Sequence, residues 1–403
     1  MSNTPEERMP GPRQPLDRRD FLRTTVEATL GGGLVGSGLV RGGLVGGGLV
    51  GGMGQFTPEW GCWSGEEARG PLPEPPPTWR CLDIHVHVAG VGAGGSGCFV
   101  RKDVLDSLKF RFFCLVTGMR RDRLDEADSL YVARLLDLIR SSKRIDQAVI
   151  LALDGVLDRD GRLDRDRTAF YVPNDYVLSL AREHQELLAG ASIHPGRPEA
   201  LDELERVAAE GAVLVKWLPN SQGIRPDDKA YCPFYRKLAS LRLPLLTHTG
   251  REYTLETIDQ SLGDPSRLEL ALEEGVTVIA AHAASQGRDE SSSHFDRLLE
   301  LIERYPRLYM DISALTLIHR AWALVRLASR TDLHDRLVYG SDYPVPCFPP
   351  LAPFYFPRRI PLERMFELQA LDNVLQRDVD IKRALGVPAA IFARGYELIR
   401  RPA

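Results

Sequence analysis

From residue 80 onward, short apolar runs alternate with amphipathic stretches. The runs are apolar over nearly their whole length, the pattern of strands buried on both faces of a parallel sheet. Between them, Ser293–Tyr305 repeats apolar residues at i, i+3, i+4 and i+7, which predicts a helix, and we expect further helices over Lys229–Leu241 and Leu255–Glu274. The eight runs are Arg80–Val88, Asp146–Leu153, Leu187–Ile193, Ala212–Leu218, Leu243–Thr247, Val276–Ala281, Arg307–Ser313 and Arg336–Ser341.

The spacing of these runs indicates how they are connected. Lys216, His248, His282, Ser313 and Asp342 each end a run, and the steps between them are 32, 34, 31 and 29 residues. One strand–helix unit of a parallel sheet needs roughly 30 residues or more. Eight such units predict an α/β protein, a (β/α)₈ TIM barrel. The alternative, a doubly wound open sheet, lacks support because no G-x-G-x-x-G pattern follows the first run.

Two loops of the predicted barrel are enlarged, residues 89–145 after the first strand and 155–175 after the second. Within the first, the glycine-rich segment Gly90–Gly97 is interpreted as a flexible active-site loop. The second contains Asp160-Gly161, which predicts a hairpin turn. Its acidic residues do not match a calcium-binding loop, so a solvated lid is the preferred interpretation.

The N-terminal region has a different composition. Residues 18–23, Arg-Arg-Asp-Phe-Leu-Arg, resemble a twin-arginine export signal and precede a Gly-Leu-Val repeat. We therefore expect residues 1–55 to be an export signal, which would make the protein periplasmic or exported. The alternative is that they are a low-complexity leader and that the protein is cytoplasmic. The glycine content argues against a stable membrane span. Residues 56–79 are rich in proline and predict an extended linker, which leaves 80–403 for the barrel.

Composition narrows the possible partners. The net charge is −4 and the basic residues are not clustered, which argues against nucleic-acid binding. A small-molecule substrate is the expected partner, and a homo-oligomer is left open. The six cysteines form no C-x-x-C pair, which excludes zinc ribbons and thioredoxin-like motifs, and we expect them to be buried apolar residues.

The strongest chemical signal is His85-Val86-His87 in the first run. Residues two apart in a strand project to the same face, so both imidazoles are expected at the carboxyl end of the barrel, where active sites of this fold lie. His248, His282 and Asp342 end later runs on the same rim. Three or four nitrogen and oxygen ligands with an open position are what a catalytic divalent metal requires.

This arrangement resembles the amidohydrolase superfamily, specifically the amidohydrolase-related branch that includes aminocarboxymuconate-semialdehyde decarboxylase and uncharacterised metal-dependent hydrolases. The resemblance covers residues 80–400 and implies that His85, His87, His248 and Asp342 bind a divalent metal, expected to be Zn²⁺. It implies one metal, with a second left open. His282 would orient the water or polarise the substrate, and Asp342 would transfer the proton.

Lys216, which ends the fourth run, has three possible roles. As a carbamate it would bridge two metals, as in binuclear members of the superfamily. As an ammonium it would bind a substrate carboxylate. The third role is that of an ordinary strand-end lysine whose amine extends to solvent.

Other polar residues near the strand ends are weaker candidates for substrate binding: Arg251 and Tyr253 after His248, His194 after the third run, and Asn220 with Gln222 after Lys216. The function expected from the whole pattern is hydrolysis of an amide, ester or lactone by a metal-activated water. The alternative is non-hydrolytic decarboxylation of a small aromatic or unsaturated carboxylic acid.

Overall fold

The structure, a computed structural model of the chain, describes residues 79–289, 292–345 and 352–400. The predicted leader (1–55), nearly all of the predicted linker, and Cys62 and Cys347 lie outside these ranges. None of the helices among the described residues is long and apolar enough to span a bilayer.

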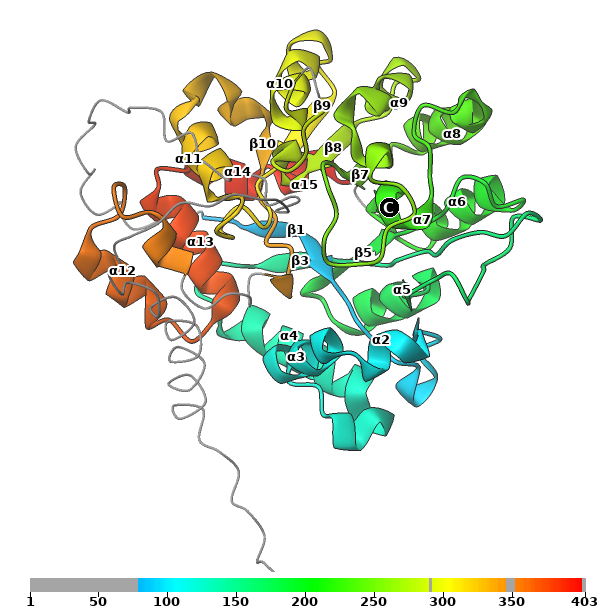
Figure 1. Ribbon diagram of the computed structural model, residues 1–403, viewed down its shortest axis with the longest axis horizontal. Helices are drawn as coiled ribbons and strands as arrows, with labels where there is room; N and C mark the ends of the chain where they lie inside the picture. The colour runs from blue at the N-terminus through cyan, green and yellow to red at the C-terminus, as the bar shows by residue number, and fades with distance from the viewer. Residues whose placement is uncertain (1–78, 290–291, 346–351, 401–403) are drawn as a thin grey trace, which may run out of the picture. The chain divides into compact units, whose positions relative to one another are not determined.

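Eight parallel strands form one sheet, in the order in which they occur along the chain (Figure 1). Each of the eight predicted runs overlaps one of them, and only β7 extends past its run, by one residue. The strands are β1 (Leu82–His87), β3 (Gln147–Leu151), β5 (Leu187–Ala191), β6 (Leu214–Trp217), β7 (Leu245–His248), β8 (Val278–Ala281), β9 (Leu308–Asp311) and β10 (Leu337–Val338).

Backbone hydrogen bonds between the first strand and the end of the last close this sheet. Ile84 N donates to Tyr339 O at 3.2 Å, and His87 N donates to Tyr343 O at 2.8 Å. Val86 forms a parallel bridge with Tyr343. These contacts complete the predicted (β/α)₈ barrel.

Helices follow the strands and surround them (Figure 1). Up to residue 241 the helices are α2 (Lys102–Asp106), α3 (Leu108–Thr117), α4 (Ala127–Ser141), α5 (Asn174–Glu183), α6 (Ala200–Ala209), α7 (Pro219–Gln222) and α8 (Cys232–Leu241). After it come α9 (Glu269–Glu273), α10 (His294–Arg304), α11 (Ala321–Ser329), α12 (Leu362–Gln369), α13 (Val374–Ala384), α14 (Ala389–Ala393) and α15 (Gly395–Leu398). Helix α10 confirms the predicted Ser293–Tyr305 helix, and α8 occupies most of Lys229–Leu241.

The single helix predicted over Leu255–Glu274 is wrong. The structure has two 3₁₀ turns there, η4 (Gln260–Gly263) and η5 (Pro265–Leu268), before the short α9. Pro265 lacks a backbone N–H and disfavours helical geometry in the residue before it. Asp264 is accordingly extended, and its side chain caps the next turn by accepting from Ser266 N.

The two enlarged loops meet each other. Strand β2 (Phe99–Val100) in the first pairs antiparallel with β4 (Phe170–Tyr171) in the second. The predicted hairpin at Asp160-Gly161 is confirmed, with a bridge between Leu157 and Leu163 and a left-handed φ of 77° at Gly161. The first loop carries α2, α3, α4 and the 3₁₀ turns η1 (Ala93–Gly95) and η2 (Arg121–Glu126).

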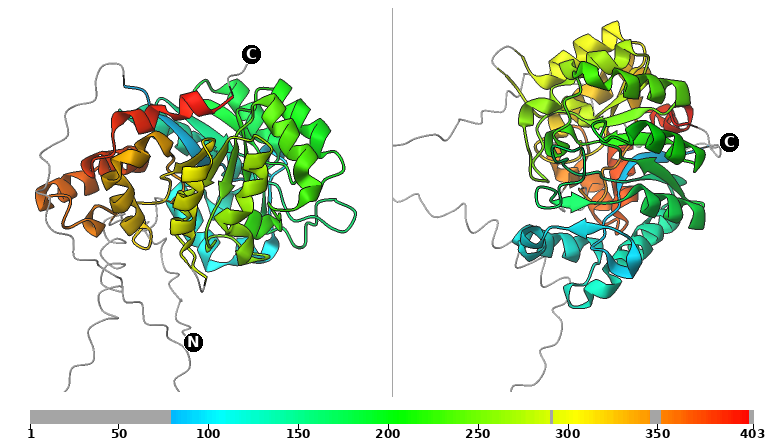
Figure 2. Two further views of the ribbon diagram at one scale, coloured as in Figure 1. Left: turned by 90° about the horizontal axis from the view of Figure 1, so that it is seen from above. Right: turned by 90° about the vertical axis from the view of Figure 1, so that its right-hand side faces the viewer.

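The hydrophobic core has two parts. Side chains such as Leu82, Ile84 and Leu246 fill the barrel interior together with Ile399 from the C-terminal segment. A larger cluster lies between the strands and the surrounding helices. Helices α14 and α15 contact β1, and Figure 2 shows the red C-terminal helices beside the blue first strand. The carboxyl-end mouth of the barrel is therefore left for polar side chains.

The cysteines in the described residues are all free thiols. Cys81, Cys98 and Cys114 are buried, as expected of small apolar residues, whereas Cys232 at the start of α8 is partly exposed.

A buried ion pair supports the end of β10. Lys382 on α13 donates to Asp378 at 2.5 Å and to the carbonyl of Gly340 at 2.9 Å. Asp378 also accepts from Thr316 Oγ1 and Tyr339 OH. Both members of the pair are essentially fully buried, so each charge depends on the other.

We predict that Lys382→Met lowers the free energy of unfolding by about 3–5 kcal/mol, because it leaves the Asp378 carboxylate buried without its counter-charge. Urea unfolding followed by circular dichroism measures this. Lys102 and Asp106 form an exposed pair with the same i, i+4 spacing, so Lys102→Met is the matched control and should leave the unfolding midpoint unchanged. Equal effects of the two substitutions would contradict the prediction.

Candidate metal centre

The two histidines of β1 point into the same space at the carboxyl end of the barrel. Their Nε2 atoms are 3.3 Å apart. The pairing of β1 with β3 is irregular between Asp83 and Val86. The Asp83 carboxylate spans this irregularity, because its Oδ1 accepts from His85 N at 3.1 Å and from Ser341 N at 2.9 Å. Asp83 thus fixes the backbone of the histidine strand to the end of β10.

Asp342 reaches the histidines through the same closure. Its backbone N donates to His85 O at 2.8 Å, and its φ of 66° lies in the left-handed region. Such a conformation costs free energy in a residue other than glycine and is concentrated at functional sites. Gly340 allows the close approach, because a Cβ at this position would lie 2.7 Å from the Cβ of His85.

Three side chains converge on one point. Asp342 Oδ1 lies 3.3 Å from His85 Nε2 and 3.2 Å from His87 Nε2. One ligand atom from each of these residues lies within 4.8 Å of the others. His85 is fully buried, while the His87 side chain is 27% exposed, so the cluster is open to solvent on one side. Two imidazole nitrogens and a carboxylate oxygen form a donor set that suits a divalent metal.

Buried carboxylates orient two of the imidazoles. Asp311 Oδ2 accepts from His85 Nδ1 at 2.7 Å, which leaves the Nε2 lone pair directed at the cluster. In the loop after β7, Glu252 Oε2 lies 3.4 Å from Nδ1 of His248, the last residue of β7, and His248 Nε2 is buried without a hydrogen-bond partner among the described residues. A carboxylate behind a histidine is the usual support of a metal-binding imidazole. The unpaired Nε2 is therefore accounted for if His248 is a ligand.

His282 belongs to the same network. Its ring lies 5.0 Å from that of His248 and 5.1 Å from that of His85, measured between centroids. Ser313 Oγ donates to Asp311 Oδ1 at 2.5 Å and can therefore accept from His282 Nδ1 at 2.8 Å. These hydrogen bonds place the proton of His282 on Nδ1 and leave Nε2 as an acceptor.

Burial sets the charge of these groups. It lowers the pKa of His85, His248 and His282 below the ordinary value, so these imidazoles are neutral at pH 7, as metal ligands must be. Burial raises the pKa of Asp311, but the neighbouring His85 and Ser313 outweigh it and hold this pKa at about 2. For Asp342 the nearby His85 and His87 likewise outweigh burial, so its pKa is below the ordinary value.

Lys216 extends into the cluster from β6. Its Nζ lies 3.0 Å from His85 Nε2, and the side chain is fully buried. This contradicts the third predicted role, in which the amine of Lys216 extends to solvent. Burial lowers its pKa to about 8, so a fraction of the amine is neutral near physiological pH.

Arg320, at the start of α11, is a second buried cation near the cluster. It is 6% exposed, and Nη1 donates to Ser285 Oγ at 3.1 Å. Burial lowers the pKa of His248 and His282 most, and the positive charge of Arg320 lowers both further.

The structure gives the residues predicted to bind substrate different surroundings. Arg251 is exposed and the Tyr253 side chain is 56% exposed, whereas Glu252 between them is buried. Asn220 is fully buried, and its amide donates to Gly250 O and Gln260 O, each at 3.1 Å. Asn220 therefore holds the loop that follows His248.

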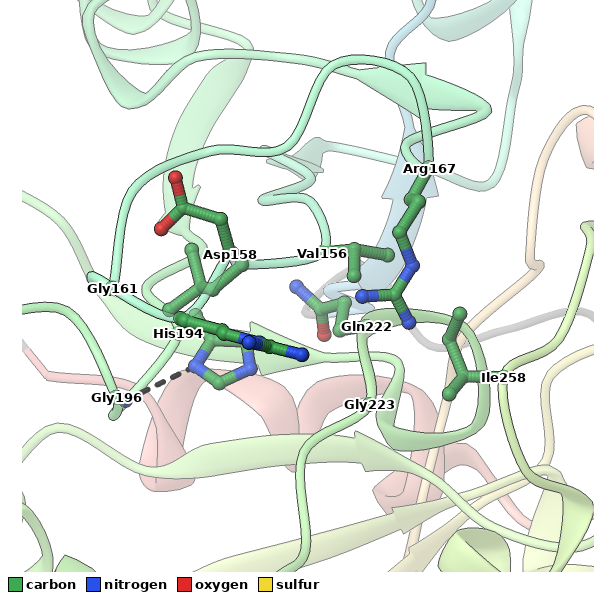
Figure 3. Close-up of a pocket in the computed structure, with 11 residues that line it drawn as sticks. Val156, Asp158, Gly161, Arg167, His194, Gly196, Gln222, Gly223 and Ile258 are labelled. Carbon is green, nitrogen blue, oxygen red and sulfur yellow. Dashed lines mark hydrogen bonds between the residues drawn. The ribbon is translucent and has the colours of Figure 1, made fainter.

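His194 lines a separate cavity of about 360 Å³ on the loops after β3, β5 and β6 (Figure 3). Arg167 and Asp158 from the enlarged second loop line it too, together with Gln222. His194 Nδ1 accepts from Gly196 N at 3.0 Å, and burial lowers the pKa of His194 to about 4. None of the residues His85, His87 and Asp342 lines this cavity.

Comparison with known families adds to this geometry. Residues 83–363, more than half of the chain, match the profile of the family described as amidohydrolase. The chain belongs to the amidohydrolase family. This family is enzymatic and metal-dependent, and it includes both hydrolases and decarboxylases.

Solved structures similar to this amidohydrolase are distant in sequence. An uncharacterised TIM-barrel protein from Bordetella bronchiseptica is 16% identical, with a TM-score of 0.49, over 76% of this chain and 99% of its own. A proposed 2-pyrone-4,6-dicarboxylic acid hydrolase from Pseudomonas putida is 15% identical (TM-score 0.47, 79% and 94% covered). A 5-carboxyvanillate decarboxylase from Sphingomonas paucimobilis is 14% identical (0.43, 78% and 99%). None of the curated proteins compared with the chain matches it.

The sequence pattern did not indicate Asp311, Glu252 or Arg320 as residues of the site. Asp311 had a usable signal, because it is a lone acid in the apolar run Leu308–Asp311 and precedes Ser313 by two residues on the same face. Glu252 and Arg320 lie in irregular loops, where no periodicity indicates which side chain points inward.

We predict that Asp311→Asn weakens metal binding roughly 10- to 100-fold without removing a ligand, because the amide no longer fixes His85 with Nδ1 protonated. Competition with a metal chelator measures the dissociation constant. Asp335, an exposed acid at the opposite end of β10, provides the control Asp335→Asn, which should bind metal like the unmodified protein. Undiminished affinity in Asp311→Asn would contradict the orienting role.

Proposed function

We propose that this amidohydrolase is a metal-dependent hydrolase acting on an amide, ester or lactone bond. The observation that supports this most directly is the convergence of His85 Nε2, His87 Nε2 and Asp342 Oδ1 within 3.2–3.3 Å at the open end of the barrel. His248, with its unpaired buried Nε2, supplies a fourth donor. Nitrogen donors with one carboxylate suit Zn²⁺, which we propose as the metal.

When bound, a divalent metal would lower the pKa of a coordinated water from 15.7 to about 7 and polarise the scissile carbonyl. The protein's own part begins with Asp342, which is ionised and can accept the proton of the attacking water. The same carboxyl group can then return this proton to the leaving amine or alcohol.

His282 has a more specific part in this scheme than the sequence indicated. Because its Nδ1 proton is directed at Ser313, its Nε2 can accept a hydrogen bond but, while the ring is neutral, cannot donate one. This favours orientation of the water over stabilisation of a developing oxyanion. The chain from His282 through Ser313 to Asp311 fixes the imidazole in that orientation.

The second candidate is non-hydrolytic decarboxylation of a small aromatic or unsaturated acid. The buried cations Lys216 and Arg320 favour it, because a carboxylate substrate would compensate their charge.

Export of the protein through its N-terminal leader stays a prediction.

Loss of the first two histidines tests the metal centre. We expect His85→Ala/His87→Ala to lose bound metal and activity while the circular dichroism spectrum is unchanged, because these side chains serve the site rather than the core. Elemental analysis of the full chain measures metal content, and His184→Ala/His334→Ala, two partly exposed histidines elsewhere, is the control. Full metal occupancy in the first variant would refute the proposal.

The reaction itself is decided by assaying the zinc-loaded protein against lactones, esters, amides and aromatic acids. Hydrolysis consumes water and yields an acid together with an alcohol or amine, whereas decarboxylation releases CO₂. Release of CO₂ without hydrolysis of any member of the panel would favour the second candidate over the first.

Lys216 distinguishes one metal from two. We expect Lys216→Ala to retain its metal and to raise KM, because the buried ammonium binds an anionic part of the substrate. Elemental analysis and steady-state kinetics measure the two quantities. A carbamate on Lys216, with two metals bound in the unmodified protein and half of that content in the variant, would show that Lys216 bridges metals instead.

A further inference from the structure

The Arg320 guanidinium is buried without a full set of partners. Nη1 donates to Ser285 Oγ, and Nε has no hydrogen-bond partner among the described residues. Within the same ranges, no carboxylate oxygen lies within the 4.0 Å of an ion pair with Arg320. Buried arginines in proteins are normally paired with a carboxylate, so this arrangement needs an explanation.

The planar shape of the guanidinium shows where a partner could bind. The N–H of Nε and one N–H of Nη2 point in parallel along one edge, which is the edge that holds both oxygens of a carboxylate. Ser285 occupies Nη1, on the other side of the group. Among the described residues, the hydrogen-bonding capacity of the Nε–Nη2 edge of Arg320 is therefore unused.

This edge belongs to the neighbourhood of the metal cluster. Ser285 lies in the turn that follows His282, and its backbone N donates to His282 O at 3.0 Å. The negative charges of Asp342, Glu252 and Asp311, which belong to the candidate metal centre and its supports, raise the pKa of Arg320. Arg320 thus stands on the β8 and β9 side of the cluster, whereas Lys216 reaches it from β6.

The cost of burial points to a ligand. Burial lowers the pKa of Arg320, and the three acids near it do not offset this effect. A metal held by Asp342 would add further positive charge. An anionic ligand compensates a buried cation of this kind, whereas a neutral one leaves it uncompensated.

We propose that Arg320 is a substrate-binding residue that holds a carboxylate of the substrate through its Nε–Nη2 edge, beside the metal cluster. This inference rests on the proposed function in that it places the substrate at the same site, and it adds that the substrate is an organic acid. The proposed role of Arg320 applies to both candidate reactions, hydrolysis of an ester, amide or lactone bond and cleavage of the bond to a second carboxylate.

The test compares two probes of nearly the same shape, benzoate and benzamide, by calorimetric titration of the metal-loaded full chain. The unmodified protein should prefer benzoate. Arg320→Met should bind benzoate roughly 10- to 100-fold more weakly and benzamide within about twofold, because only the carboxylate uses both N–H groups. Arg320→Lys, which keeps the charge and loses the planar edge, should lie between them.

Stability without a ligand separates this role from a structural one. Arg320→Met removes an uncompensated buried charge, so its melting temperature should equal or exceed that of the unmodified protein, and the rise caused by benzoate should disappear. If Arg320 instead holds the fold together, Arg320→Met melts lower or does not fold, and the proposal fails. An unmodified protein with no preference for benzoate also overturns it.

Arg304→Met, a change to an exposed arginine at the end of α10, is the control and should leave benzoate binding within about twofold, while Arg251→Met tests the rim arginine that the sequence suggested for substrate binding. If Arg251→Met loses the preference and Arg320→Met retains it, the carboxylate is bound at the rim and the proposal is wrong. These titrations need no turnover. Failure of the hydrolysis assay therefore leaves them valid, while loss of metal in His85→Ala/His87→Ala reports separately on the metal centre.

Discussion

Closure of the barrel between β1 and residues 339–343 is the constraint on which the site depends. The backbone bonds that close the sheet, Ile84 N to Tyr339 O and His87 N to Tyr343 O, bracket the bond from Asp342 N to His85 O. The first and last strands are far apart in sequence, and closure brings their polar ends within hydrogen-bond distance. Gly340 permits this approach, and Asp83 and the Lys382–Asp378 pair hold it from either side.

The site gathers buried charges that would be unstable separately. Asp311 accepts from His85, Ser313 and the backbone N of His282, so one ionised carboxylate organises two imidazoles. Glu252 faces His248 in a similar arrangement. Because Asp311 fixes the proton of His85 on Nδ1, its Nε2 stays available as an acceptor, which a metal needs. These acids are therefore as important to the chemistry as the predicted ligands.

Two cations border this acidic and imidazole-rich region. Lys216 touches His85, and Arg320 donates to Ser285 in the turn after His282. A metal bound at the cluster would add its charge to those of the two buried cations, and we infer that such a site favours anionic ligands, since each charge adds to the same local field. This preference connects the hydrolase and decarboxylase proposals, because either reaction would act on an organic acid.

The sequence by itself determined the architecture. Eight apolar runs at intervals near 30 residues were enough to predict the barrel, because strands buried on both faces are continuously apolar and each strand–helix unit has a minimum length. It also placed His85, His87, His248, His282 and Asp342 on one rim, since polar residues that end parallel strands share an edge.

Only the tertiary structure decided which loop residues turn inward. Glu252 is buried between the exposed Arg251 and Tyr253, and Arg320 is buried next to the exposed His319. Loop backbones follow no repeat, so their side-chain directions are set by hydrogen bonds to distant segments that no local pattern contains.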